Sequence, residues 1–136
     1  MTSFSQLDSR GGLQHLVSID SLPPDLVREI LDRAEHYLRR PGEPAPHLRE
    51  LEGVTIANIF SEPSTRTRAS FEVAGKRLGA DVINLDLMLS SRAKGETILD
   101  TVHTLEAMQV DVFVIRDAQA GVPQFVAENV RGHVSV

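Results

Sequence analysis

Apolar residues recur at helical spacing in the first third of the chain. The segment Ser21-Leu22-Pro23-Pro24-Asp25 combines a hydroxyl residue, two prolines and an acid, which is typical of a helix start. The apolar positions that follow are Leu26, Val27, Ile30, Leu31, Ala34, Tyr37 and Leu38. Three prolines and a glycine in residues 41–46 predict the end of this helix and a stiff loop. Residues 1–20 show little periodicity, and we interpret them as a loose N-terminal arm.

From residue 54 onward, short apolar runs alternate with longer amphipathic ones. The short runs predict strands at 54–60, 81–85 and 111–115, with a fourth strand starting at 133; the longer runs predict helices at 68–78, 96–108 and 122–129. Such repeats imply parallel strands joined by right-handed crossovers. The predicted fold is therefore α/β, a doubly wound parallel sheet with helices on both faces, in a single domain over residues 21–136.

Composition narrows the classes of function. The 136 residues are 41% hydrophobic, enough for a real core, and carry a net charge of −5 from 14 basic and 19 acidic residues. This acidic balance argues against nucleic-acid binding. There is no cysteine, and the five histidines lack metal-ligand spacing, so we expect neither a metal nor another cofactor. No apolar run is long enough to span a bilayer, and residues 1–12 lack a signal-peptide pattern, so we expect a soluble cytoplasmic protein without membrane contact.

The most informative segment is Ser61-Glu62-Pro63-Ser64-Thr65-Arg66-Thr67-Arg68, between the strand at 54–60 and the helix at 68–78. The N–H groups of a first helical turn are unpaired, and the helix dipole is positive there. Ser64, Thr65 and Thr67 add hydroxyl donors, and Arg66 can bind a phosphate or carboxylate with two parallel hydrogen bonds. The segment therefore predicts an anion site. The alternative is an ordinary Ser/Thr cap followed by two solvated arginines.

Two further polar positions fall at the ends of predicted strands, where ligands bind in this class of sheet. Residues 89–97 read Leu-Ser-Ser-Arg-Ala-Lys-Gly-Glu-Thr and follow the second strand. Taken alone, they fit a flexible basic loop that caps the next helix at Glu96. Arg116 ends the third strand, and taken alone it fits the first solvated residue after an apolar run.

The run Ser64-Thr65-Arg66-Thr67-Arg68 resembles the carbamoyl-phosphate motif of the transcarbamoylase family, and the likeness extends from about residue 54 to the chain end. Lys94-Gly95-Glu96-Thr97 resembles the loop by which the aspartate branch inserts a lysine into the active site of a neighbouring subunit. Ser90 matches the serine four residues before that lysine. The ornithine branch shares the first motif and lacks this one, and the pair Glu62-Pro63 also resembles the aspartate branch.

The resemblance implies a role for each matched residue. Ser64, Thr65, Arg66 and Thr67 would bind the phosphate and carbonyl oxygens, with Arg66 carrying most of the leaving-group charge. Thr67 and Arg116 would polarise the carbonyl, and Glu62 would hold arginines in place. Ser90 and Lys94 would reach a phosphate in the adjacent subunit. The catalytic residues expected from the resemblance are thus Arg66, Thr67, Arg116 and Lys94.

The resemblance also implies the reaction and the partners. The intact enzyme would be a homotrimer that transfers a carbamoyl group from carbamoyl phosphate to L-aspartate, giving N-carbamoyl-L-aspartate and phosphate for pyrimidine synthesis. The family's second domain, which binds aspartate, does not follow within these residues, so we expect binding of carbamoyl phosphate or phosphate without turnover. Contact with dihydroorotase or regulatory subunits is left open. The alternatives are an ornithine-type transcarbamoylase and a non-catalytic phosphate-binding or assembly module.

Overall fold

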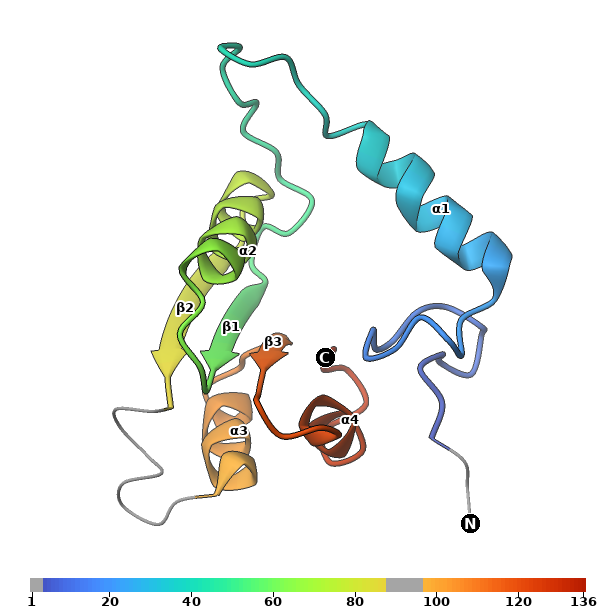
Figure 1. The fold of residues 1–136 in the computed structure, drawn as a ribbon, viewed down its shortest axis with the longest axis vertical. Helices are drawn as coiled ribbons and strands as arrows, with labels where there is room; N and C mark the ends of the chain where they lie inside the picture. Colours follow the sequence, from blue (N-terminus) through green and yellow to red (C-terminus); the bar gives the residue numbers. More distant parts are fainter. Residues whose placement is uncertain (1–3, 88–96) are drawn as a thin grey trace. The chain divides into compact units, whose positions relative to one another are not determined.

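The computed structural model describes residues 4–87 and 97–136 (Figure 1). Its contacts divide the chain into two compact units, Met1–Pro46 and His47–Val136, and each is described by itself. The expected division of the chain at residue 21 stays a prediction.

The first unit holds helix α1 (Pro24–Glu35), preceded by a small hydrogen-bonded turn structure. The side chain of Gln6, which is buried, donates to Ser18 O and to Ser21 Oγ, both at 2.7 Å. Leu7 and Leu13 form an antiparallel bridge. These contacts join residues 6–21 to one another within the predicted arm and the start of α1's leading segment. The expected hydroxyl cap of α1 is wrong, because Pro23 occupies the N-cap position and the Ser21 hydroxyl accepts from Gln6 instead.

The second unit is a parallel sheet of three strands, β1 (Thr55–Phe60), β2 (Asp81–Asp86) and β3 (Val112–Arg116), in the order β2-β1-β3 (Figure 1). The helices are α2 (Thr65–Arg77), α3 (Ile98–Ala107) and α4 (Val122–Ala127). The central strand is buried from its second residue to its last, as expected for a strand covered on both faces. The expected start of a fourth strand at 133–136 is seen as a single parallel bridge, in which Ser135 pairs with Val112 beside β3.

Successive side chains of β1 point to opposite faces of the sheet. Ala57 and Ile59 join Phe113 in the main core, to which α3 and α4 contribute Val102, Leu105, Val122 and Val126. Ile56, on the other face, lies against α2 near Gly75. Helices thus cover both faces, and the predicted parallel α/β sheet is confirmed.

Helix α2 packs on the sheet through a glycine and a chain of polar contacts. A Cβ atom added to Gly75 would lie 2.8 Å from Val82 Cγ2, so the helix approaches closely at this point. The fully buried Asn58 donates to Asn84 Oδ1 at 2.9 Å, and Asn84 donates to Glu72 Oε2 at 2.8 Å. Hydrogen bonds from Lys76 and then Asn84 lower the pKa of the Glu72 carboxyl. Glu72 therefore stays ionised and accepts from both donors.

Helix α2 begins three residues earlier than expected. Thr65 is its first residue, so most of the Ser/Thr/Arg cluster forms the first turn of the helix. The end agrees with expectation: Gly79 adopts a φ of +90° just after the C-cap, a conformation that glycine tolerates best. The turn predicted to bind an anion therefore belongs to a helix that packs on the sheet.

Candidate functional site

The strand order gives a topological switch point between β1 and β3. Strand β1 leads through α2 to β2 on one side, whereas β3 lies on the other side of β1. The chain leaves the carboxyl ends of these two strands in opposite directions, which is where open α/β sheets bind ligands. Phe60 and Arg116, the last residues of β1 and β3, are partners in the strand register. The loops that follow these two residues start side by side at this point.

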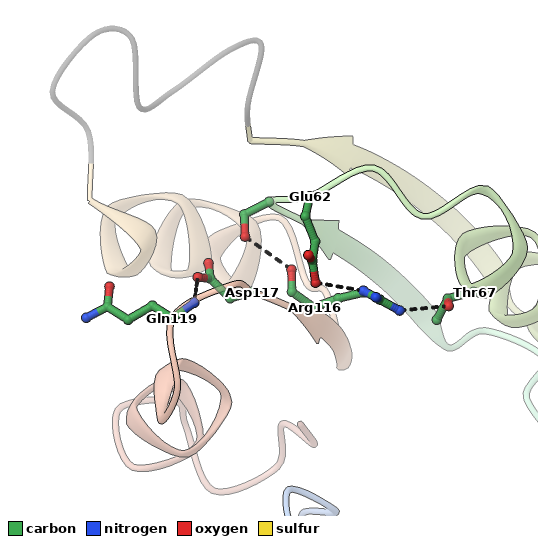
Figure 2. Close-up of polar contacts among 6 residues, drawn as sticks. Glu62, Thr67, Arg116, Asp117 and Gln119 are labelled. Carbon is green, nitrogen blue, oxygen red and sulfur yellow. Dashed lines mark hydrogen bonds and ion pairs between the residues drawn. The ribbon is translucent and has the colours of Figure 1, made fainter.

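Arg116 lies between the side chains of Glu62 and Thr67 (Figure 2). Its Nε donates to Glu62 Oε1 at 2.9 Å, and its Nη1 donates to Thr67 Oγ1 at 3.1 Å. The side chains of Arg116 and Glu62 are 45% and 37% exposed, so solvent weakens the ion pair. The pair therefore orients the guanidinium of Arg116 and contributes little to the stability of the fold. Among the residues that the structure describes, Nη2 of Arg116 makes no hydrogen bond. This nitrogen can meet a ligand oxygen.

Ser61 fixes the backbone at the base of Arg116. Its backbone N–H and its hydroxyl both donate to Arg116 O, at 2.9 and 3.3 Å. Sequence reasoning gave Ser61 no such role, although a serine directly after a buried strand is a usable signal. On the far side, Asp117 accepts from the backbone of Gln119 at 2.9 Å and shapes the turn after β3 (Figure 2).

The first turn of α2 presents unused donors. The first hydrogen bond of the helix runs from Arg68 N to Ser64 O at 3.0 Å, which leaves the N–H groups of Thr65, Arg66 and Thr67 ahead of it. Ser64 occupies the N-cap position but makes no side-chain cap hydrogen bond. The alternative of a simple Ser/Thr cap is therefore wrong. Backbone and hydroxyl donors at one helix start suit an anion.

Arg66 is exposed and its side chain makes no hydrogen bond or ion pair within 4–87 and 97–136. An unengaged guanidinium beside three unpaired N–H groups can close on an oxyanion without breaking an existing contact. Glu62, Ser64, Thr65, Arg66, Thr67 and Arg116 are thus gathered at one sheet edge, from β3, the loop after β1 and the start of α2. The other expected site residues, Ser90 and Lys94, lie outside the described residues.

Two searches of the described residues gave negative findings. No cluster of three or more His, Asp or Glu residues is arranged to hold a metal ion there. No helix in that part of the chain is both long enough and apolar enough to cross a membrane.

The fold is a parallel α/β sheet, and arginine and hydroxyl side chains gather at the carboxyl ends of β1 and β3. The sequence matches the family model for the aspartate/ornithine carbamoyltransferase carbamoyl-phosphate-binding domain over residues 14–136. The chain belongs to this family.

Solved structures of both branches are similar to the chain. The catalytic subunit of M. jannaschii aspartate transcarbamoylase is 38% identical over 90% of this chain and 40% of its own, with a TM-score of 0.75. Aspartate transcarbamoylase from Trypanosoma cruzi, in complex with carbamoyl aspartate and phosphate, is 31% identical over 90% and 38%, with a TM-score of 0.74. Ornithine carbamoyltransferase from Thermus thermophilus is 25% identical over 90% and 41%, with a TM-score of 0.76. The chain spans about two fifths of the length of these structures.

Proposed function

We propose that this carbamoyl-phosphate-binding domain serves an aspartate carbamoyltransferase. The observation that carries the proposal is the placement of Arg116, held by Glu62 and Thr67 next to the unused donors of the α2 start. Carbamoyl phosphate is a mixed anhydride with a carbonyl oxygen beside a phosphate. Its recognition needs cationic and hydroxyl donors aimed at both groups, and this edge of the sheet supplies them.

The proposed roles follow the charge that develops during transfer. The amine attacks the carbonyl carbon, the new C–N bond forms, and the C–O bond to phosphate breaks as the amine loses a proton. Negative charge grows first on the carbonyl oxygen, where we assign Thr67 and Arg116, and then on phosphate, where we assign Ser64, Thr65 and Arg66. Fixed donors at such positions typically lower a barrier by about 3–4 kcal/mol each.

Ser90 and Lys94 complete the proposal from the sequence alone. In the aspartate branch the matching lysine enters the site of a neighbouring subunit, so we assign both residues to an adjacent copy within a homotrimer. The run from Lys94 to Thr97 supports aspartate as acceptor, and so does the higher identity to the M. jannaschii enzyme than to the ornithine enzyme. A cytoplasmic role in pyrimidine synthesis belongs to the same proposal.

Titration calorimetry on the whole chain tests the site. Carbamoyl phosphate is expected to bind more tightly than inorganic phosphate, because only the former has a carbonyl oxygen for Thr67 and Arg116. Equal affinities would favour a plain phosphate-binding module. Formation of carbamoyl aspartate by the chain alone would contradict the expectation of binding without turnover.

A pair of analogues tests the acceptor. A phosphonoacetyl group is joined either to the α-amino group of L-aspartate or to the δ-amino group of L-ornithine. The aspartate compound is expected to bind more tightly, since its additional carboxylate adds negative charge beside the phosphonate that Lys94 is assigned to reach. The Lys94→Met variant is expected to reduce this difference. A preference for the ornithine compound would favour the other branch of the family.

A further inference from the structure

Arg68 closes the first turn of α2, one residue after Thr67, and its side chain turns back onto the sheet. That side chain is only 30% exposed. Its Nη2 lies 3.6 Å from Asp86 Oδ2, and its guanidinium carbon lies 5.6 Å from the ring centroid of Phe60. Its Nε is buried and makes no hydrogen bond among the described residues, which fits a guanidinium placed against a ring. In the sequence analysis Arg68 is only the last residue of the motif and has no role of its own.

The contacts of Arg68 lie on the same row of the sheet as the candidate site. Asp86, Phe60 and Arg116 are the last residues of β2, β1 and β3, and Phe60 is the register partner of both others. Arg68 contacts the Asp86 and Phe60 end of this row, and Thr67 contacts the Arg116 end. The first turn of α2 therefore contacts the ends of all three strands: Thr67 contacts β3, and Arg68 contacts β1 and β2.

This double attachment limits how the turn can rotate or shift. Gly75 fastens α2 to the sheet about two helical turns further along, so Thr67 by itself would hold the first turn on the β3 side only. The contacts of Arg68, with Phe60 of β1 and Asp86 of β2, restrict rotation of the turn about Arg116. A helix start fixed at two points presents its unpaired N–H groups in one direction, and anion affinity depends on such preorganisation.

We propose that Arg68 is a positioning residue of the carbamoyl-phosphate site. It does not touch the ligand; it holds the first turn of α2 through Asp86 and Phe60 so that Thr67 and the turn's N–H groups face the anion. This inference rests on the proposed function, because it concerns the affinity of that same site.

The test compares four variants of the whole chain by calorimetry with carbamoyl phosphate. Arg68→Met removes the attachment and keeps most of the side-chain stem, and Asp86→Asn removes the charge that Arg68 contacts. Arg68→Lys keeps a cation that can still pair with Asp86. Arg77→Met is the matched control, since it removes the same charge from an exposed position in the last turn of the same helix.

Asp86→Asn separates positioning from long-range charge. Through charge alone, removal of a nearby carboxylate strengthens the binding of an anion. Through positioning, the same change weakens binding, because Arg68 loses its partner. We expect Arg68→Met to weaken binding about tenfold and Asp86→Asn by a smaller factor in the same direction. Arg68→Lys is expected to recover part of the loss, and Arg77→Met to stay within about twofold of wild type.

The double variant Arg68→Met/Asp86→Asn is expected to bind no more weakly than Arg68→Met, because both changes break one attachment. The inference is overturned if Asp86→Asn binds more tightly than wild type, or if Arg68→Met matches Arg77→Met. Urea unfolding is measured alongside; if Arg68→Met does not fold, Asp86→Asn and Arg68→Lys decide the question. Failure of the wild-type chain to bind carbamoyl phosphate would instead refute the proposed function, and the role of Arg68 with it.

Discussion

The arginines of this site differ in whether their side chains already have hydrogen-bond partners among the described residues. Arg116 is held at two of its nitrogens by Glu62 and Thr67, whereas Arg66 stands exposed without a side-chain partner in the described part of the chain. An engaged arginine is preorganised and an unengaged one is free to close on a ligand. The two arginines therefore contribute to binding in different ways, and their removal has different consequences.

Replacement of Arg66 by alanine is expected to weaken binding of carbamoyl phosphate by about ten- to a hundredfold. The change removes charge-assisted hydrogen bonds, each worth about 1.5–3 kcal/mol. The free energy of unfolding is expected to change by less than about 0.5 kcal/mol, because the side chain is exposed. Calorimetry and urea unfolding measure the two quantities on the same sample. Arg77→Ala serves as control, and unchanged affinity in Arg66→Ala would remove this arginine from the site.

Helices α2 and α3 are stabilised by different local contacts. Helix α3 starts at a capping box: Thr97 accepts from the backbone of Asp100, and Asp100 accepts in return from the backbone N–H of Thr97. Helix α2 lacks any side-chain cap and is instead fastened through Gly75 and the buried amides. Two helices of similar length are therefore sensitive to quite different substitutions.

Gly75→Ala is expected to destabilise the chain by about 1 kcal/mol. The new methyl group would meet Val82 at 2.8 Å, and overpacking costs about 1–3 kcal/mol. The better helix propensity of alanine returns up to about 1 kcal/mol. Gly132→Ala is the matched control, because nothing lies within 4 Å of a Cβ there. Unfolding in urea compares the pair, and equal stabilities would mean that α2 can move away from the sheet at little cost.

Thr97→Ala is expected to cost about 1 kcal/mol of stability at neutral pH through loss of the helix cap. Hydrogen bonds from the Thr97 hydroxyl and backbone N–H hold the pKa of Asp100 below its ordinary value of 3.8. Because the folded-state pKa is depressed, this contribution of Asp100 is present above about pH 4 and is lost as the pH falls through the folded value. The difference in free energy of unfolding between wild type and Thr97→Ala should therefore become smaller in acid. Unfolding curves from pH 7 to pH 3 measure this difference. If it stays constant, the ionisation of Asp100 does not contribute to the helix cap.

The periodicity of the sequence predicts the positions of the three strands well and the ends of the helices less well. The runs at 54–60, 81–85 and 111–115 match β1, β2 and β3 closely. The buried central strand β1 is mostly apolar, whereas β2 mixes apolar and polar residues and has no buried residue. The start of α2 was placed too late, since Thr65 and Thr67 read as cap residues although they lie within the helix. The supposed strand at 133–136 has the right residue types but pairs at one position only, a tertiary outcome that composition does not encode.

At the scale of the whole molecule, the site depends on pairing between distant segments. Glu62 and Arg116 are 54 residues apart in sequence and meet only because β1 and β3 are aligned in register. The residue types of the site could be predicted from motifs, whereas the contacts of Arg68 with Asp86 and Phe60 could not. They follow from the register of β1 with β2, which no local pattern specifies.

The strand order β2-β1-β3 has a consequence for folding kinetics. Asn58 and Asn84, which join β1 to β2, are 26 residues apart, whereas the pairing that brings Arg116 to Glu62 closes a loop about twice as long. We expect β1 and β2 to associate first and β3 to join after the rate-limiting step. Carbamoyl phosphate would then bind a site that is complete only once β3 has joined, because Arg116 is the last residue of β3. The ligand should slow unfolding more strongly as a larger fraction of the folded chain is bound, and it should leave the refolding rate unchanged. Stopped-flow refolding and unfolding with and without the ligand measure both rates, and faster refolding would mean that β3 is already docked in the transition state.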